Sequence, residues 1–127
     1  QARRALELAK RLHSPGSVCR YMDYSFFDLL DRAGDPVALG LFCHPALSLL
    51  SRYDHKNGTD LYHTLEQFLA CNCSIKDTAQ TMFIHRNSLT YRLERIRVLT
   101  QLDLEDSQTR FLLEMSYRID HFAGLDG

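Results

Sequence analysis

The sequence is poor in the residues that break regular structure, because its 127 residues include only three prolines and six glycines. This scarcity excludes a collagen-like chain and argues against a loop-rich one. No apolar run approaches the roughly 18 residues that a membrane-spanning helix needs, so we expect no membrane association. No apolar block follows a basic start, so we expect no secretory signal and a cytoplasmic protein.

An excess of either charge is also lacking, because 15 Lys and Arg residues oppose 16 Asp and Glu residues, for a net charge of −1. This balance excludes a polycation that coats nucleic acid, but it permits a basic face on one part of the surface. The composition, 45% hydrophobic and 24% charged, is that of a globular protein with a modest core. The chain begins with Gln1 and with residues typical of a helix interior, so we expect a piece of a longer protein.

Cysteine is sparse, and its spacing does not suit a metal site. Cys71 and Cys73 are too close for an ordinary disulfide with each other, and the default is reduced thiols in a cytosol. A zinc site would recruit these two cysteines and His63, but zinc ligands usually leave two to four residues between cysteines. We therefore expect no metal and no cofactor, with Cys19 and Cys43 as plain structural or surface residues.

Apolar residues recur at helical spacing along most of the chain, which predicts a mainly all-α fold. We expect helices over residues 2–13, 26–34, 37–42 and 86–99, helices that begin near residues 45, 60, 75 and 107, and a short strand over 18–22. Residues 54–58 are predicted to form a linker, and residues from 120 onward a tail. The expected N-caps are Ser25, Thr59, Ser74 and Asp106 or Ser107. The expected inward residues of the later helices are Leu47, Leu50 and Tyr53; Leu61, Leu65, Phe68 and Leu69; Ile75, Ala79 and either Met82 or Phe83; Leu89, Leu93 and Ile96; and Phe111, Leu112, Met115 and Ile119.

Three of these helices, beginning near residues 60, 75 and 86, have the layout of a helix-turn-helix, because only a very short turn joins the second to the third. The small Ala79 suits a close crossing of the two helices, and apolar residues surround the turn. Phe83 stands where such turns usually have glycine, and a bulky residue at positive φ would be strained. Either the turn has a different shape, which we favour, or the motif is not a helix-turn-helix.

The predicted helix 86–99 carries a local excess of positive charge. Four arginines oppose only Glu94, which gives +3 in a chain whose total is −1. Such an excess suits the neutralisation of DNA phosphates, although a solvated charged face is the commoner reason for such a pattern. With this helix in the major groove, the residues expected to face bases are His85, Arg86, Asn87, Ser88, Thr90 and Tyr91, and those expected to meet phosphates are Lys76, Arg92, Arg95 and Arg97.

Residues 53–120 resemble the C-terminal helix-turn-helix domain of the PucR family of bacterial transcription regulators, which includes the sugar-diacid regulators. The most specific stretch is Phe83-Ile84-His85-Arg86-Asn87-Ser88-Leu89-Thr90-Tyr91-Arg92-Leu93, and Phe83 is typical of the turn in this family. Two departures are Ser88, where the family commonly has Thr, and Gln101, where it often has Gly. The second departure concerns the cap of the loop after the recognition helix.

The resemblance implies a sequence-specific reader of double-stranded DNA that acts as a homodimer, with a small-molecule effector bound by an N-terminal sensor outside this chain. It also implies a division into residues 1–52, helices from the end of a GGDEF-like linker region; 53–122, the DNA-binding domain; and 123–127, a tail.

Two other functions compete with DNA binding. The apolar N-terminal helices would suit a helical protein–protein interaction or dimerisation module without direct DNA contact, through Phe26, Phe27, Leu39, Leu47 and Leu50. An enzyme is disfavoured, because the sequence has no nucleophile elbow, phosphate loop or metal-spaced cluster.

Overall fold

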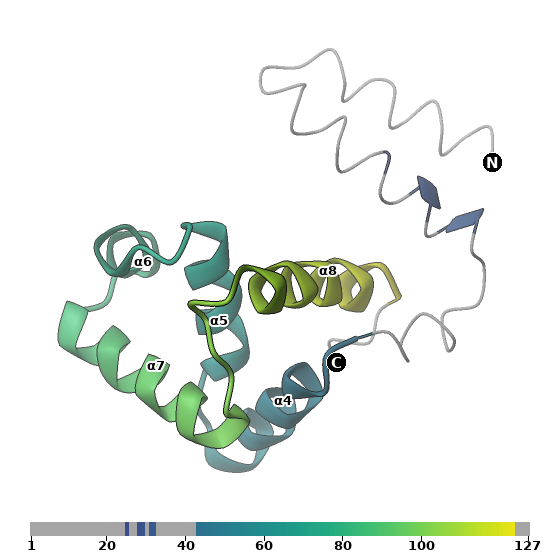
Figure 1. Cartoon of the computed structure of the whole chain (residues 1–127). Helices are drawn as coiled ribbons and strands as arrows, with labels where there is room; N and C mark the ends of the chain where they lie inside the picture. The colour runs from purple at the N-terminus through teal and green to yellow at the C-terminus, as the bar shows by residue number, and fades with distance from the viewer. Residues whose placement is uncertain (1–24, 26–27, 30, 33–42, 124–127) are drawn as a thin grey trace.

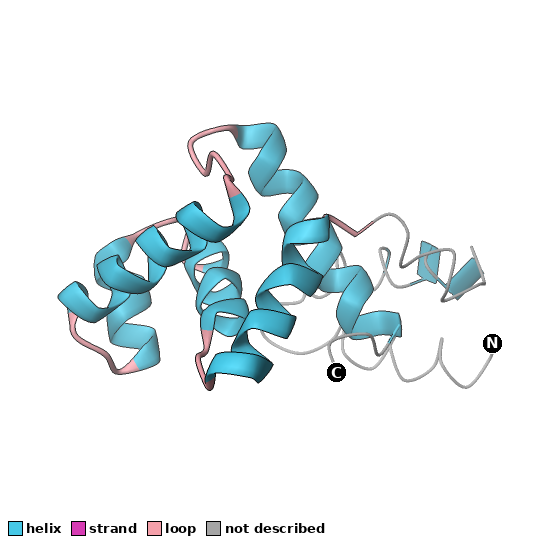
Figure 2. Ribbon diagram, turned by 90° about the horizontal axis from the view of Figure 1, so that it is seen from below, coloured by secondary structure: helices cyan, strands magenta, loops and turns pink. Residues whose placement is uncertain are grey.

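The computed structural model describes residues 25, 28–29, 31–32 and 43–123, and every regular element among them is a helix. The predicted helices 2–13 and 37–42, the strand 18–22 and Cys19 lie outside the described residues. The expected cap Ser25 is itself helical. Within 43–123 the helices are α4 (Pro45–Asn57), α5 (Leu61–Ala70), α6 (Ile75–Met82), α7 (Arg86–Thr100) and α8 (Ser107–Ala123), joined by the short loops seen in Figure 2. This confirms the all-α prediction. No helix in the described part of the chain is both long and apolar enough to cross a membrane.

Helix α5 is the centre of the described fold, because the other four helices all contact it. Figure 1 shows α6 and α7 on one side of α5 and α8 on the other. The predicted apolar stripe of α5 is confirmed, since Leu61, Leu65, Phe68 and Leu69 are all buried. The core also takes in residues from the other helices and from the loop after α7: Ala46, Leu47, Leu50, Ile96, Leu102, Leu113 and Tyr117.

Helix α4 begins where the sequence predicts and ends later. His44 is its N-cap and Pro45 occupies its first turn. The predicted linker over residues 54–58 is wrong, because the helix continues to Asn57 and stops at Gly58, which takes the left-handed conformation at φ 66°. The expected domain boundary between residues 52 and 53 falls inside this helix.

A carboxylate from α4 caps α5. Asp54 accepts hydrogen bonds from the backbone N–H groups of Leu61 and Tyr62, both at 2.8 Å, and from the Thr59 hydroxyl. The predicted cap by Thr59 is therefore wrong: the N-cap residue is Asp60, and its own side chain makes no cap bond. The caps of α6 and α8 are as predicted, because Ser74 accepts from Asp77 N–H and Asp106 accepts from Thr109 N–H.

The predicted inward face of α8 is partly wrong. Ile119 is buried and Met115 is half-buried, as predicted, but Phe111 and Leu112 are exposed, whereas Leu113, Ser116 and Tyr117 are buried. The predicted tail from residue 120 is also wrong, because α8 continues to Ala123. Polar contacts with α5 explain both differences: the Tyr62 hydroxyl donates to the buried Asp120, and the Tyr117 hydroxyl donates to the Tyr62 carbonyl at 2.6 Å. Burial is the main cause of a Tyr117 pKa far above its ordinary value.

The Asp54 cap can be tested by substitution. We expect Asp54→Ala to lower the free energy of unfolding by about 1–3 kcal/mol, because two N–H groups of α5 lose their acceptor. Chemical denaturation followed by circular dichroism measures the change. Asp60→Ala is the matched control and should change it by less than about 0.5 kcal/mol. The cap assignment would be wrong if the control were the more harmful substitution.

Candidate nucleic-acid interface

The turn between α6 and α7 keeps the ordinary shape of a helix-turn-helix. Phe83 lies in the left-handed region, at φ 57° and ψ 42°. Its N–H donates to the Gln80 carbonyl at 3.2 Å, and the Ile84 N–H donates to the Ala79 carbonyl at 3.0 Å. These two bonds form the Schellman motif, which requires a left-handed residue at this position. The favoured prediction of a differently shaped turn is therefore wrong.

The two helices of the motif are also packed as the sequence predicts, with one exception. Ala79 of α6 and Leu89 and Ile96 of α7 are buried. The exception is Ile75, which is exposed; of the alternatives Met82 and Phe83, Met82 is half-buried and Phe83 is exposed. Ile75 is the first residue of the eight-residue α6, which buries only its middle.

His85 starts α7 as its N-cap. Its Nδ1 accepts a hydrogen bond from the Asn87 N–H at 3.0 Å. An accepting Nδ1 carries no proton, so Nε2 is the protonated nitrogen of the neutral ring and is a donor. His85 is exposed, and its free donor can therefore meet a phosphate or a base edge at the start of the helix.

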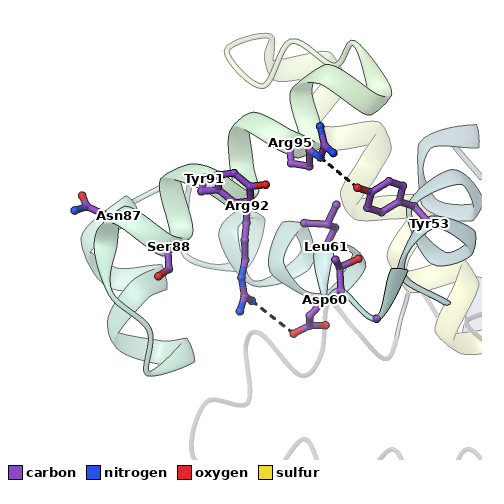
Figure 3. Close-up of a pocket in the computed structure, with 10 residues that line it drawn as sticks. Tyr53, Asp60, Leu61, Asn87, Ser88, Tyr91, Arg92 and Arg95 are labelled. Atoms are coloured by element: carbon purple, nitrogen blue, oxygen red, sulfur yellow. Dashed lines mark hydrogen bonds and ion pairs between the residues drawn. The ribbon is translucent and has the colours of Figure 1, made fainter. Parts of the chain in front are cut away.

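The first half of α7 presents polar side chains to solvent. The five residues that follow His85 in the expected base-facing set are all exposed: Arg86, Asn87, Ser88, Thr90 and Tyr91. The Thr90 hydroxyl donates to the Arg86 carbonyl at 3.0 Å, which leaves its oxygen as an acceptor. Figure 3 shows Asn87 at the end of the helix, pointing away from the body of the domain.

Arg92 points inward rather than toward solvent. Its Nη1 donates to the buried Thr64 Oγ1 at 3.1 Å and lies 3.8 Å from Asp60 Oδ2 (Figure 3). These contacts attach α7 to the start of α5, so this arginine has a structural role beside any contact with phosphate.

Two further arginines of α7 also have partners within the chain. Arg95 donates from Nε to the Tyr53 hydroxyl at 3.2 Å, and its guanidinium lies 5.9 Å from the centre of that ring (Figure 3). Arg97 donates from Nε to Glu94 at 3.1 Å. The hydrogen bond from Arg97 lowers the pKa of Glu94, which keeps this exposed pair ionised. Glu94 is already counted in the local charge of +3, so it is the ion pair of Arg92 with Asp60 that compensates part of this charge.

An open groove of about 680 Å³ separates α7 from the turn between α4 and α5. Ser88, Tyr91, Arg92 and Arg95 line one side of it (Figure 3). Its other side contains residues that the sequence analysis did not select as DNA-contacting: Tyr53, Thr59 and Asp60. Only the packing of α4 beside α7 brings them there, and no local pattern signals it.

Lys76 lies apart from this groove, exposed near the start of α6. His63 is also exposed, and its Nδ1 lies 3.7 Å from Glu66 Oε1. Cys43, Cys71 and Cys73 are free thiols. Among the residues that the structure describes, no group of three or more His, Cys, Asp or Glu side chains is placed to hold a metal ion.

The short Schellman turn, the buried Ala79 and the exposed polar start of α7 together define a helix-turn-helix domain, a class that reads DNA. Comparison with known families agrees, because residues 61–119 match the PucR C-terminal helix-turn-helix domain. Residues 61–119 therefore form a helix-turn-helix domain of the PucR type, as the sequence resemblance implies.

Curated relatives match over the same region. The chain is 44% identical over 64 residues to the "Proline-responsive transcriptional activator PutR" of Bacillus subtilis, which covers 50% of this chain and 16% of PutR. It is 29% identical over 76 residues to the "DNA-binding transcriptional activator AdeR" of the same organism, covering 60% of this chain and 18% of AdeR. It is 42% identical over 60 residues to the "Carbohydrate diacid regulator" of Escherichia coli, covering 47% of this chain and 16% of that protein. The alignments thus span less than a fifth of these relatives. No solved structure matches the chain.

The structural role of Arg92 yields a prediction. We expect Arg92→Ala to lower the free energy of unfolding by about 1 kcal/mol, because the buried Thr64 hydroxyl loses a partner and α7 loses a tie to α5. Arg97→Ala removes the same charge from the exposed pair and should leave stability essentially unchanged. Denaturant titration of both variants measures the difference, and equal effects would argue against a tie through Arg92.

Proposed function

We propose that α7 is the recognition helix of this DNA-binding domain and lies in the major groove of double-stranded DNA. The observation that carries this proposal is the exposure of all six expected base-facing residues, His85, Arg86, Asn87, Ser88, Thr90 and Tyr91, beside a buried Leu89. Arginine can bond guanine and asparagine can bond adenine in this groove. Of these six, Arg86 and Asn87 therefore carry most of the base discrimination.

The proposed phosphate contacts come from both sides of the recognition helix. Lys76 approaches one strand from the start of α6. Arg95 does so from the groove beside Tyr53, whose hydroxyl orients the guanidinium. Arg92 and Arg97 contribute when their guanidinium groups move from Asp60 and Glu94 toward the phosphates of the DNA backbone.

Beyond the domain itself, we propose a whole protein that acts as a bacterial transcription regulator in the cytoplasm and has no enzymatic activity of its own. A homodimer would place two recognition helices one helical turn of DNA apart. A small-molecule effector would bind a sensor outside this chain; the name of the relative PutR describes that protein as proline-responsive. Because α4 shares the core with α5, we place the start of the DNA-binding unit at about residue 43 rather than 53.

The base-reading role of Asn87 is tested by Asn87→Ala. We expect binding to an enriched duplex to weaken at least 10-fold, equivalent to about 1.4 kcal/mol, while binding to random duplex is largely kept. Selection from a random duplex pool followed by fluorescence anisotropy gives both affinities. An equal loss on both kinds of DNA would contradict base reading by Asn87.

The phosphate role of Arg95 is tested by a salt series. We expect Arg95→Ala to reduce the slope of log K against log salt by about 1 on any sequence, because one released counterion is lost. Arg52→Ala removes an exposed arginine of α4 and is the matched control, with an unchanged slope. An unchanged slope for Arg95→Ala would remove this residue from the phosphate set. If the folded chain bound no duplex at low salt and self-associated, the interaction-module alternative would be favoured.

A further inference from the structure

Phe83 combines two unfavourable features in one residue. Its side chain is 94% exposed, more than any other large apolar side chain among the described residues. Its backbone lies at φ 57°, where a bulky side chain is strained. An exposed aromatic ring gains no free energy from burial, so neither feature stabilises the folded chain.

The turn itself does not need this side chain. The two bonds that close it come from the backbone N–H groups of Phe83 and Ile84, and any residue except proline at position 83 would supply the first. Glycine would adopt the same conformation without strain. The phenyl ring therefore has no use in closing the turn.

Its position suggests a use outside the chain. Phe83 precedes the His85 cap of α7 by two residues and is continuous with the exposed start of the recognition helix. We propose that the Phe83 ring is an apolar contact to duplex DNA at the edge of the recognised site. This inference rests on the proposed function, because α7 must enter the groove for the turn to reach the duplex.

The chemistry of the ring limits what it can recognise. Phenylalanine has no hydrogen-bonding group, so it can contact only apolar parts of DNA: the 5-methyl group of thymine or the carbon face of a deoxyribose. His85 and Arg86 follow it by two and three residues and are exposed, so polar contacts to the same strand would flank the apolar one. Among the residues that the structure describes, the other exposed phenylalanine is Phe111, which lies on α8 and outside the helix-turn-helix motif.

The decisive variant is Phe83→Gly, because it should move stability and DNA binding in opposite directions. Removing the strain should raise Tm by about 4 °C. Removing the ring should weaken binding to the enriched duplex by about 5- to 20-fold. A residue that only supported the fold would lower both.

Gln101→Gly is the matched control. Gln101 also lies in the left-handed region, at φ 60°, but at the opposite end of α7. Its replacement should raise Tm by a similar amount and leave the affinity for the enriched duplex unchanged. Thermal melts and fluorescence anisotropy on the 127-residue chain supply both readouts.

A change in the DNA distinguishes a contact to the thymine methyl group from a contact to deoxyribose. The enriched duplex is resynthesised with deoxyuridine in place of each thymidine in turn, which removes only a methyl group. A thymine contact predicts one position where this change weakens the wild type about 3- to 10-fold and leaves Phe83→Gly unaffected. A deoxyribose contact predicts no such position while Phe83→Gly still binds more weakly.

Four results would overturn the contact. If Phe83→Gly binds the duplex as tightly as the wild type, while Asn87→Ala loses specific binding, the Phe83 contact is wrong and the assignment of α7 as the recognition helix is kept. If Phe83→Gly unfolds at a lower temperature, the ring packs within the chain. If it changes self-association in sedimentation and not DNA affinity, the ring meets a protein. A folded wild type that binds no duplex at low salt would remove the proposed function and the contact together.

Discussion

Burial of α5 is the constraint on which the described fold depends. The other four helices within residues 45–123 all contact it, and Leu65 at its middle is fully buried. The first backbone N–H groups of a helix have no hydrogen-bond acceptor within that helix. In a helix surrounded by others, neighbouring residues must supply these acceptors. Asp54 of α4 meets that need, so the position of α4 follows from the start of α5 as well as from its own buried residues Leu47 and Leu50.

The same central helix determines which face of α7 remains for a ligand. Leu89 and Ile96 are buried in the domain, and Arg92 adds a polar tie to Thr64 on the flank beside α5. Arg95 makes the corresponding tie to Tyr53 of α4. The face opposite these contacts cannot be buried by the described helices. It carries the polar start of α7, which is the surface that we propose for DNA.

Much of this arrangement could be predicted from the sequence, and the limits have a physical cause. The stripes of α5 and α7 were predicted correctly, since the residues that bury a helix recur at local spacing. The failures have causes that helical spacing does not reveal. The linker over 54–58 and the Thr59 cap depend on the hydrogen bonds of Asp54 with Leu61 and Tyr62, seven and eight residues along the chain. The missed part of the inward face of α8 depends on Tyr62 of α5, 55 and 58 residues from its partners Tyr117 and Asp120. Asp54 and Asp120 are ordinary acidic residues until α5 places N–H and hydroxyl donors against them. Tyr53 and Asp60 were missed in the groove for the same reason.

The turn between α6 and α7 has Phe83 where glycine is usual. The free-energy cost of a left-handed residue and the free energy of the hydrogen bonds that close the turn decide whether the turn keeps its ordinary shape. A left-handed conformation costs an ordinary residue about 1–2 kcal/mol. Closing the Schellman motif satisfies two carbonyl groups of α6, and the net value of two such bonds is of the same size. The burial of Ala79 and Leu89 stabilises the ordinary turn further. Gln101 keeps the left-handed conformation at the other end of α7 with a single such bond, from its N–H to the Arg97 carbonyl at 2.8 Å. Glycine at these positions is thus a preference of about 1 kcal/mol and not a requirement of the motif.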